Sequence, residues 1–586
     1  MRLAFSAKSP LSGFAEQHHS RIAVRPVTTC SLPREREGEP RRQERPRRYE
    51  GGRPGAAARR QEGQRSSPRS SSGQNGDQGR QGRRPQQARQ QSDEEIPVVR
   101  PGQAASATFF SAERWADVGA SEQVVAAVAA LGITRPSHIQ AASYRVLGPL
   151  ASAGATPPRH VVLADHAGSG KTLAYLLPLL QLLKGEEALL GGAATQPHCP
   201  RLVVAVPTAE LAAQVLRVAR ALCRGPSGLR LRCGAFTGGR PLRTQREALE
   251  GGVDVAVGTP GRLAELLAEG ALRLDFCRAV VCDEVDVLLG QDFSFADQVR
   301  PLHAAAPDTT RFVFATATIP EQVYLDLEEE FPGLVAALGP GLHRTAPGIT
   351  EQLVDCSGGD EVNEETGFQR KAAALYAVLQ EQRAPRTIVF CNKIETCRKV
   401  ENFLNRTFGR EDNVWVLPHH AAITDERRDA NLRRFLVPPA GSGGSSGRSR
   451  GARQRGGGGG GATERLVLVC TDRASRGLDS AFVEHVVLFD LPRDPSEYLR
   501  RVGRTTRGAG GSGLVSVLAL GRQVKLAKEI IERNQGGLAL HRVPAALPVL
   551  LPSGPSDADR LAADLAAAAA APTAAATAAE PDVAED

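Results

Sequence analysis

The chain contains 586 residues and weighs 62.2 kDa, so it is too long for one compact core and has room for about two domains once its low-complexity ends are set aside. Its formal net charge is +8, but residues 1–100 hold 21 Lys and Arg against 11 Asp and Glu, which leaves the remainder slightly acidic. No apolar run reaches the roughly 20 residues of a membrane-spanning helix, and the ten cysteines lack the spacing of zinc ligands or of a disulfide framework. We therefore expect a soluble protein without a membrane partner, whose cysteines are reduced thiols of the core.

The N-terminal part reads as two segments without a globular core. Residues 1–33 hold Arg, Lys, Ser and Thr but a single acid, Glu16, which is the composition of an organellar transit peptide; an untargeted N-terminus is the alternative. Residues 34–107 are rich in Arg, Gly, Gln, Ser and Pro, and burial cannot offset the ordering entropy of such a segment. We expect a disordered arm, which either attracts nucleic-acid phosphates without reading their sequence or only keeps the protein in solution.

Two series of short apolar runs, alternating with amphipathic stretches, occupy residues 108–342 and 343–535. Apolar strands separated by helices indicate a parallel sheet covered on both faces, so we expect two tandem α/β domains with doubly wound parallel sheets. A Gly-rich insertion at 437–463 interrupts the second domain, and a low-complexity tail occupies 536–586. The expected strands are 160–165, 201–207, 254–258, 278–284, 311–318, 386–392, 414–420, 465–471, 485–492 and 513–520. The expected helices are 172–183, 210–222, 262–270, 370–382, 396–406 and 425–435.

The first strand leads into HAGSGKT, a Gly-rich turn that opens a helix. Gly168 and Gly170 allow backbone N–H groups to approach phosphate oxygens, Lys171 can pair with the β and γ oxygens, and Thr172 can ligate Mg²⁺. The full pattern GxxxxGK[ST] fails at its first position, where Asp165 stands, and an ordinary glycine turn is the alternative. The position between a strand and a helix favours a nucleotide site.

Acidic residues follow the expected strand 278–284. Asp283 and Glu284 would stand at its carboxyl end, where open parallel sheets place their ligands. Beside a phosphate loop, Asp283 would hold Mg²⁺ and Glu284 would activate the water that attacks the γ-phosphate. The alternative is a helix start whose acids complement the dipole.

Four stretches together resemble the DEAD-box ATP-dependent RNA helicases: GSGKT at 168–172, DEVD at 283–286, TAT at 316–318 and YLRRVGRTTRG at 498–508. The similarity covers about residues 110–530 and implies two RecA-like domains with ATP and Mg²⁺ as cofactors. The residues that it assigns to catalysis are Lys171, Asp283, Glu284 and two arginine fingers, Arg504 and Arg507. Those that it assigns to the nucleotide are Trp115, Gln140, Ala167, Gly168, Ser169, Gly170, Lys171, Thr172 and Asp479, with Thr172 and Asp283 holding the metal.

The same resemblance assigns RNA contacts in both domains. They are Pro207, Thr208, Gly238, Gly239, Thr259, Pro260, Gly261, Arg262 and Thr471. The residues that would couple the state of ATP to RNA are Asp286, Thr316 and Thr318. In the family such contacts reach phosphates and sugars, so RNA binding should be largely independent of base sequence.

Several positions depart from the family pattern. Ala209 and Thr506 replace a usual Arg and Gly, Arg500 replaces a His, and Ile133, Val285 and Thr316 replace an aromatic residue, an Ala and a Ser. None of these changes removes the lysine, the acids or the arginine fingers. We therefore expect activity to survive with an altered coupling to RNA.

Together these features predict a monomeric, RNA-stimulated ATPase that separates short duplexes or remodels RNA–protein complexes. A nucleotide-gated RNA clamp or scaffold with little unwinding is an alternative that the departures motivate. A DNA translocase of the same architecture is disfavoured by the resemblance at Gln140 and at 498–508. The N-terminal composition points first to the plastid and second to the mitochondrion, where rRNA maturation with ribosomal or RNP assembly factors would be the duty.

Overall fold

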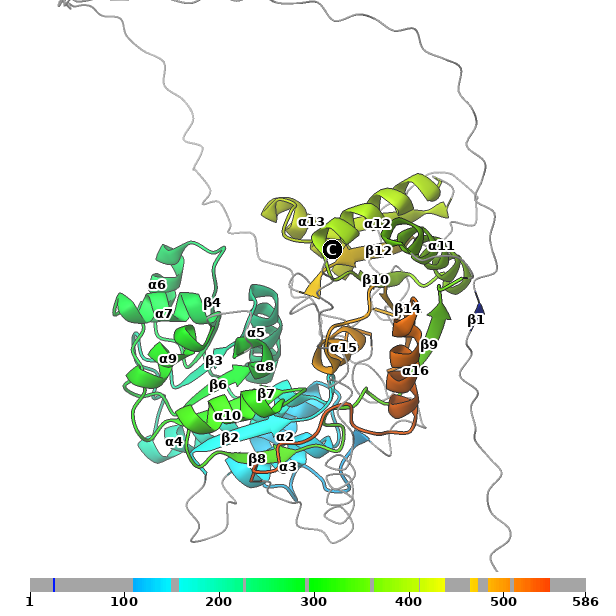
Figure 1. Cartoon of the computed structure of the whole chain (residues 1–586). Helices are drawn as coiled ribbons and strands as arrows, with labels where there is room; N and C mark the ends of the chain where they lie inside the picture. Colours follow the sequence, from blue (N-terminus) through cyan, green and yellow to red (C-terminus); the bar gives the residue numbers. More distant parts are fainter. Residues whose placement is uncertain are drawn as a thin grey trace, which may run out of the picture. The chain divides into compact units, whose positions relative to one another are not determined.

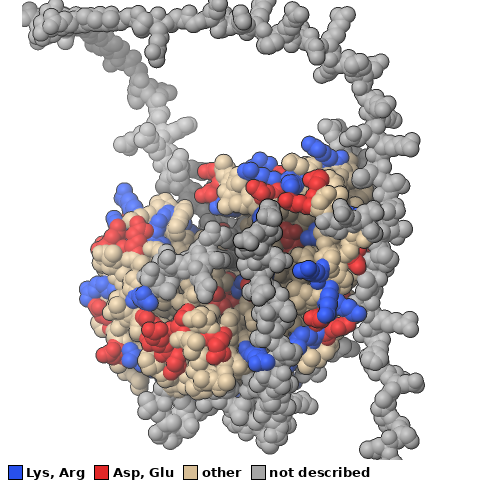
Figure 2. All heavy atoms as spheres, viewed as in Figure 1, with Lys and Arg blue, Asp and Glu red and all other residues tan. Residues whose placement is uncertain are grey.

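The structure is a computed structural model that describes residues 25–26, 109–148, 158–224, 228–289, 295–358, 363–409, 412–437, 464–472, 483–505 and 511–548. The predictions for the Arg-rich arm, the Gly-rich insertion, the end of the C-terminal tail and nearly all of the transit peptide lie outside these residues. Within them, no helix is both long and apolar enough to cross a membrane. Figure 2 shows acidic and basic side chains interspersed over one face of this part of the chain.

The first domain is built on a parallel sheet of seven strands (Figure 1). Their spatial order is β4 (Cys233–Phe236), β5 (Val255–Gly258), β3 (Leu202–Ala205), β6 (Ala279–Asp283), β7 (Arg311–Thr316), β2 (His160–Ala164) and β8 (Val335–Leu338). The inner strands β2, β3 and β6 are buried along their whole length and almost wholly apolar, because helices cover both faces of the sheet.

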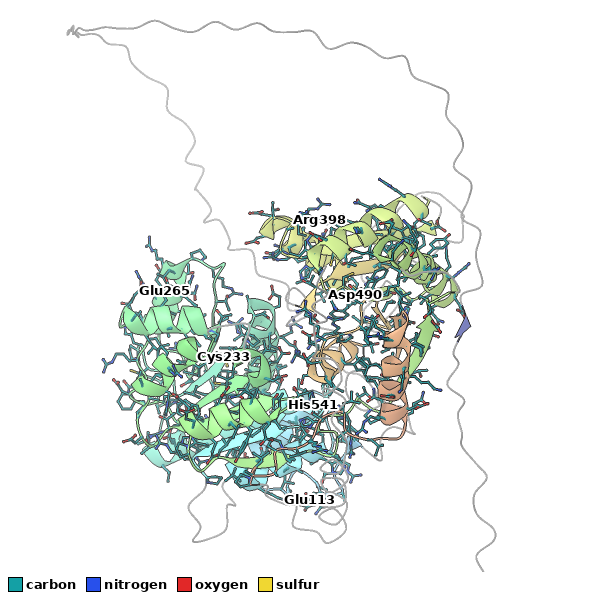
Figure 3. All side chains as sticks on the ribbon, in the orientation of Figure 1. Glu113, Cys233, Glu265, Arg398, Asp490 and His541 are labelled. Atoms are coloured by element: carbon teal, nitrogen blue, oxygen red, sulfur yellow. The ribbon has the colours of Figure 1, made fainter. Side chains whose placement is uncertain are left out.

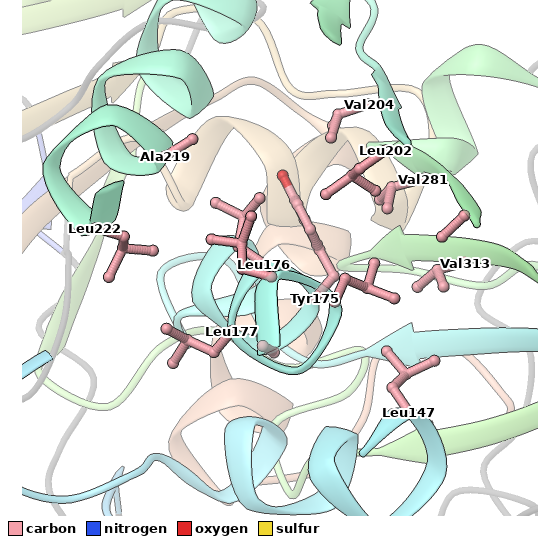
Figure 4. Packing of buried hydrophobic residues seen from close by; sticks show 14 of the residues in the cluster. Leu147, Tyr175, Leu176, Leu177, Leu202, Val204, Ala219, Leu222, Val281 and Val313 are labelled. Atoms are coloured by element: carbon pink, nitrogen blue, oxygen red, sulfur yellow. The ribbon is translucent and has the colours of Figure 1, made fainter. Parts of the chain in front are cut away.

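Alternate residues of each strand enter two separate hydrophobic clusters. Val161 and Leu163 of β2 belong to one cluster, whereas Val162 and Ala164 belong to the other, as the two-residue period of a strand requires. Figure 4 shows part of the first cluster, around Tyr175. This cluster is covered by α2 (Glu122–Ala130), α3 (His138–Leu147), α4 (Lys171–Leu190) and α5 (Ala209–Cys223). The second is covered by α6 (Leu242–Glu250), α7 (Pro260–Ala268), α8 (Val285–Leu288), α9 (Phe295–Ala305) and α10 (Glu321–Glu330).

The second domain repeats this plan on another parallel sheet of seven strands. Their order is β1 (Arg25–Pro26), β9 (Ile349–Asp355), β14 (Gly513–Ala519), β13 (His485–Leu488), β10 (Arg386–Phe390), β12 (Arg465–Cys470) and β11 (Val414–His419). One face carries α11 (Glu364–Gln382) and α12 (Ile394–Thr407), and the other carries α13 (Asp425–Leu436), α15 (Pro495–Val502) and α16 (Arg522–Gln535). The edge strand β1 comes from the segment expected to be a transit peptide.

The fold class expected from the sequence is confirmed, since both domains are α/β units with parallel sheets. Each strand and helix named from the apolar pattern is present, and most ends agree within about three residues. Helix α4 continues seven residues beyond its expected end, α11 begins six residues before its expected start, and β13 ends four residues early. Strands β1, β4, β8 and β9 were not expected, nor were helices α2, α3, α6, α8, α9, α10, α15 and α16. In β4 and β8 the reason is that CGAF and VAAL are short and contain mostly small residues of low β-propensity.

The folded chain continues past α16 to residue 548, beyond the boundary expected at 535. The N–H of Leu540 donates to the carbonyl of His343 at 2.9 Å, and that of Ala336 on β8 donates to the carbonyl of Pro548 at 2.8 Å. Leu547 is buried in a cluster of the first domain. The segment therefore contacts both domains: the Leu540 side chain packs on the second domain, and the end of the segment packs on the first.

Candidate functional site

The strands that carry the nucleotide motifs end side by side. Strands β6, β7 and β2 are neighbours in the first sheet, with Ala164 paired to Thr316 and Asp283 paired to Ala315. The loop after β2, the acids at the end of β6 and the threonines at the end of β7 therefore meet at one edge. This edge is the carboxyl end of the strands, where parallel sheets bind ligands.

The loop between β2 and α4 uses glycine where other residues would be strained. Gly168 has φ +84° and Gly170 has φ +90°, both in the left-handed region. A Cβ on Gly170 would also lie 2.4 Å from Nε2 of Gln140. Helix α4 begins at Lys171, so its first N–H groups and its dipole face the loop. This geometry suits a phosphate anion.

Lys171 folds back onto the loop. Its Nζ donates to the carbonyl oxygens of Asp165 and His166, each at 2.8 Å. Burial lowers the pKa of Lys171, although four nearby carboxylates, with that of Asp165 foremost, oppose the shift. The ammonium group therefore lies beside the loop on weak neutral acceptors that phosphate oxygens can replace.

The departure at Asp165 has a structural role. Its Oδ1 accepts hydrogen bonds from the N–H groups of His166, at 2.8 Å, and of Gly341, at 2.9 Å. A Cβ on Gly339 would meet the Asp165 carboxyl at 2.2 Å, and one on Gly341 would meet the His166 ring at 2.1 Å. The carboxylate thus ties the start of the phosphate loop to the chain that leaves β8.

Asp283 is a buried carboxylate at the end of β6, with 5% of its surface exposed. The hydroxyl of Tyr175 on α4 donates to its Oδ2 at 2.9 Å, and the N–H of Glu284 donates to its Oδ1 at 2.9 Å. Burial raises the pKa of Asp283 to about 6, and the neighbouring Glu284 carboxylate adds to the rise. The site therefore concentrates negative charge that a cation would stabilise.

Glu284 has a left-handed backbone, with φ 51° and ψ 50°, at the start of α8. Such a conformation is uncommon for a residue with a side chain, and functional sites are where it is usually found. Its Oε1 accepts a hydrogen bond from Nη2 of Arg504 at 3.4 Å. Arg504 follows α15, so this contact joins the second domain to the acids of the first.

A second contact between the domains lies at Asp286. Its Oδ2 accepts from the hydroxyl of Thr318 at 2.7 Å and from Nη1 of Arg500 at 3.1 Å. Thr316 in turn donates to the carbonyl of Thr318 at 2.6 Å. The three residues predicted to couple ATP to RNA thus form one chain of hydrogen bonds, which ends on the arginine that replaces the family's histidine.

Helix α15, which carries Arg500 and leads directly into Arg504, is anchored in the second domain. Its N-cap, Asp494, accepts from the N–H of Glu497 at 2.9 Å. Arg501 is buried and binds both carboxylate oxygens of Asp472, at 2.7 and 2.5 Å, and the side-chain oxygen of Asn392 at 2.7 Å. This fixed helix presents Arg500 and Arg504 to the first domain. Arg507, the other predicted finger, lies outside the described residues, as do Thr506 and the ribose-contact candidate Asp479.

The residues predicted to read adenine occupy different environments. Gln140 caps α3, accepting from the N–H of Ser137 at 2.9 Å and donating to the carbonyl of Gly170 at 3.2 Å. It lies against the phosphate loop, and among the described residues its Nε2 donates only to Gly170, which leaves its second N–H for a ligand. Trp115 is 3% exposed, and its ring packs edge-on against Tyr144 with 6.4 Å between the centroids. Its contact with a nucleotide stays a prediction.

The predicted RNA contacts of the first domain follow three neighbouring strands. In the order β4, β5, β3, the last residues Phe236, Gly258 and Ala205 are paired side by side. The predicted segments continue from these ends: Gly238 and Gly239 after β4, Thr259 to Arg262 after β5, and Pro207 and Thr208 after β3. Thr208 and Thr259 are the N-caps of α5 and α7, and Pro260 and Gly261 lie in the first turn of α7. The sheet thus gathers them along one edge.

The second domain places its predicted contact in the same way. Thr471 follows β12, whose last residue, Cys470, is paired with both Phe390 of β10 and His419 of β11. The segments after these three strands therefore share one edge. Whether RNA contacts Thr471 stays a prediction.

Sequence reasoning missed three features of the site. The first is Tyr175, whose hydroxyl donates a hydrogen bond to Asp283; in an apolar helix, a tyrosine is predicted only to be part of the hydrophobic core. The contacts of Asp165 with Gly341 and of Arg500 with Asp286 join segments far apart in the chain. The only signal for these was that both positions depart from the family pattern.

The fold and the glycine loop define a P-loop nucleotide-binding protein with two RecA-like domains. The family profile described as DEAD/DEAH box helicase matches residues 144–326, and the one described as helicase conserved C-terminal domain matches residues 460–509. The chain belongs to the family of DEAD-box ATP-dependent RNA helicases.

Curated relatives and solved structures are similar to most of the chain. DEAD-box ATP-dependent RNA helicase 50 of Oryza sativa subsp. japonica is 45% identical over 438 residues, covering 74% of this chain and 63% of the relative. The protein of that name from Arabidopsis thaliana is 44% identical over 440 residues, covering 75% of this chain and 52% of the relative. The chain thus spans between about half and just under two thirds of these relatives.

Among solved structures, S. cerevisiae Dbp5 bound to RNA and ADP BeF3 matches with a TM-score of 0.55 and 20% identity, covering 78% of this chain and 100% of that one. Mss116 bound to ssRNA and UDP-BeF matches with a TM-score of 0.56 and 20% identity, covering 78% of this chain and 83% of that one. At this identity the likeness shows the fold.

Proposed function

We propose that the chain is an ATP-dependent RNA helicase, in which RNA-stimulated ATP hydrolysis is coupled to local duplex separation or to the remodelling of RNA–protein complexes. The observation that carries the proposal is the contact of Arg504, from the second domain, with Glu284 in the first, at 3.4 Å. A reaction centre assembled from both domains makes hydrolysis depend on their closure. That dependence lets bound RNA control turnover.

Each of three side chains at the reaction centre has a separate role in ATP hydrolysis. Lys171 exchanges its carbonyl contacts for the β and γ oxygens of ATP. Glu284 orients the attacking water and accepts its proton, and Arg504 moves from Glu284 to the γ-phosphate, where it neutralises the charge that develops. The fixed helix α15 positions that guanidinium, so only a small side-chain movement is needed.

The residues present fit ATP and Mg²⁺. Mg²⁺ prefers oxygen ligands, and the hydroxyl of Thr172 and the carboxylate of Asp283 provide them. The pKa of Asp283, raised to about 6 by burial, indicates a buried carboxylate without a cationic partner close enough to offset its desolvation. Held by Thr172 and Asp283, the ion would reduce the negative charge of the phosphate groups.

The RNA would lie across the predicted contacts at the strand ends of both domains. A single strand that touches the ends of β4, β5 and β3 and the end of β12 favours the closed arrangement. Closure bends this strand, and a bent strand pairs poorly with its complement. Separation would therefore be local, and hydrolysis would release the grip.

Substitution of Glu284 tests the assignment. We expect Glu284→Gln to lower RNA-stimulated ATP hydrolysis by at least about 100-fold, because the water loses its base, while ATP-dependent RNA binding persists. Phosphate release and RNA binding with a non-hydrolysable nucleotide measure the two properties. Glu321→Gln, at the exposed start of α10, is the matched control. Undiminished phosphate release from Glu284→Gln would show that another group activates water.

The second candidate function is a nucleotide-gated RNA clamp or scaffold that unwinds little. Ala209 lacks the phosphate contact that the usual arginine offers, and Arg500 binds Asp286 through an ion pair in place of a histidine contact. A clamp would close on RNA without multiple turnover. Duplex-unwinding and steady-state ATPase assays on the same preparation separate the two functions.

For location and pathway we propose a plastid protein, with the mitochondrion second, that acts as a monomer with ribosomal or RNP assembly factors in rRNA maturation. The support is the composition of residues 1–33, which hold a single acid. A fluorescent fusion of residues 1–50 should enter plastids, and cytosolic fluorescence would contradict the proposal. Crosslinking in cells followed by sequencing of bound RNA identifies the substrate.

A further inference from the structure

Two cysteines of the first domain lie next to each other. Cys223 is the last residue of α5 and Cys233 is the first residue of β4, and their Sγ atoms are 3.8 Å apart. Figure 3 labels Cys233 within the first domain. Nine cysteines in the described residues are free thiols, and the spacing of these two in the sequence does not suggest a pair. The fold brings them together.

Backbone hydrogen bonds hold both cysteines in place. The N–H of Arg230 donates to the carbonyl of Cys223 at 3.1 Å, and the guanidinium of Arg220 donates to the carbonyl of Cys233 at 3.3 and 3.4 Å. Cys233 is also paired with Val255 of β5. A disulfide needs the sulfur atoms at about 2.05 Å, so side-chain rotation with a small shift of the edge strand would suffice.

The two thiols differ in exposure and in acidity. Cys233 is partly exposed on the edge strand, whereas Cys223 is 6% exposed. The hydrogen bond from the Cys233 thiol lowers the pKa of Cys223 and raises that of Cys233. Lys184 favours a thiolate at Cys223, and Asp254 opposes it. The sulfur of Cys233 is thus the one closer to solvent, and the sulfur of Cys223 lies 3.8 Å behind it.

We propose that Cys223 and Cys233 form a reversible disulfide that weakens the grip of the first domain on RNA; the effect on RNA, unlike the bond itself, rests on the proposed function. With a peroxide, the thiolate of one cysteine takes one oxygen and hydroxide leaves, which gives a sulfenic acid. The thiolate of the other cysteine then attacks that sulfur, the S–S bond forms, and the hydroxide that leaves takes up a proton to give water. The net change is two thiols and one hydrogen peroxide to one disulfide and two waters, and a dithiol reverses it.

The two elements that hold the pair lead to the predicted RNA contacts at their opposite ends. Strand β4 begins at Cys233 and leads into Gly238 and Gly239, and α5 runs from its N-cap Thr208 to Cys223. Shortening the sulfur distance would draw the start of β4 toward the end of α5, and a shift of the whole edge strand would displace the two glycines from the segment at Thr259. Contacts to a phosphate chain tolerate such displacement poorly. The acids and Lys171 follow other strands and should be little affected.

Oxidation of the full-length protein with hydrogen peroxide at about pH 8, followed by thiol trapping and peptide mapping, tests the bond. We expect a crosslinked peptide pair containing Cys223 and Cys233, with loss of two hydrogens, restored by dithiothreitol. Cys223→Ser and Cys233→Ser should each abolish it. Cys391→Ser is the matched control, because Cys391 lies beside Cys397 but both are fully buried. Absence of the crosslink, or the same crosslink in either serine variant, would overturn the proposal.

Two further measurements follow the consequences. The thermal midpoint of the oxidised protein should rise by several degrees over the reduced form, because the bond closes a short loop, and Cys233→Ser should show no such shift. The RNA concentration that half-saturates ATPase activity should rise at least twofold on oxidation, with the maximal rate little changed. An unchanged half-saturation in the crosslinked protein would refute the regulatory effect. A reduced protein without RNA-stimulated ATPase would instead count against the proposed function.

Discussion

Arg500 shows how one replaced residue can change the character of a contact. Where the family has a histidine, this chain has an arginine whose Nη1 lies 3.1 Å from Oδ2 of Asp286, and the aspartate side chain is 4% exposed. A guanidinium stays charged at every physiological pH, whereas an imidazole is charged only under acidic conditions. Arg500 therefore keeps its positive charge in this ion pair throughout the physiological pH range.

Arg500→His should make coupling sensitive to pH. Between about pH 6 and about pH 8 the imidazole loses its charge and leaves the buried Asp286 without a cation, so RNA-stimulated ATPase should fall by about tenfold relative to the natural chain. Rate profiles over this range measure the effect. Arg500→Lys keeps the charge and is the control. Parallel profiles for Arg500→His and the natural chain would show that the ion pair does not contribute to closure.

Glu351 supplies a second test, in the core of the second domain. Its Oε1 accepts from the Tyr498 hydroxyl at 2.5 Å and from Nδ2 of Asn534 at 3.0 Å, and burial raises its pKa from 4.5 to about 7. The folded state thus binds the proton more tightly than the unfolded chain. The resulting stability is complete below pH 4.5 and is lost as the pH rises through about 7.

Glu351→Gln stays neutral at every pH and should avoid this loss. We expect it to be more stable than the natural chain at about pH 8, by up to about 3 kcal/mol, and similar to it at about pH 5. Urea unfolding of the second domain at both values measures the difference. A variant that is less stable at the higher pH would show that the carboxylate is ionised in the fold.

At the scale of the elements, the edge formed by β4, β5 and β3 depends on close backbone approach. A Cβ on Gly258 would lie 2.4 Å from the carbonyl oxygen of Phe236 and 2.9 Å from the Leu263 side chain, so the neighbouring strand would have to move. Gly238, a few residues away along the same edge, has open space around it. Substitution of Gly258 therefore tests the packing of this edge, whereas substitution of Gly238 tests its predicted contact with RNA.

We expect Gly258→Ala to destabilise the first domain by about 2 kcal/mol, because the strand spacing cannot absorb the added methyl group. Gly238→Ala should leave stability unchanged and affect only RNA binding. Chemical denaturation and RNA titration of both variants provide the measurements. Equal stability of the two would mean that the edge strand yields without cost.

The sequence predicts these elements well and their fine geometry poorly. Buried parallel strands such as 278–284 are recognisable in the sequence as apolar runs. Because the strands are parallel, the acidic residues that follow such a run must lie at the carboxyl edge of the sheet. The left-handed backbone of Glu284 and the hydrogen bond from Tyr175 to Asp283 depend on neighbours from other elements. The local sequence around Asp283 and Glu284 does not predict such contacts, because the contacting residues are distant in the chain.

At the scale of the whole molecule, the segment 536–548 joins the end of the second domain to the first. His343, buried in the first domain, accepts from the N–H of Ile319 at 2.9 Å and lies against His541 of this segment. His541, which is labelled in Figure 3, also contacts Ser496 of the second domain at 2.7 Å. Leu547 is 5% exposed. Two stretches of chain thus connect the same pair of domains: the linker 339–348 between the two sheets, and the segment 536–548.

Removal of this segment should loosen the first domain. We expect a chain that ends at residue 535 to lose about 3 kcal/mol of stability in that domain, because the site of Leu547 opens and the backbone of β8 loses its partner at Pro548. A chain that ends at 548 keeps both contacts and is the matched control. Urea unfolding followed by proteolysis locates the loss. Equal unfolding midpoints of the two truncated chains would show that residues 536–548 do not stabilise the first domain. If only the chain that ends at 535 unfolds at a lower urea concentration, this segment supplies part of the core of the first domain.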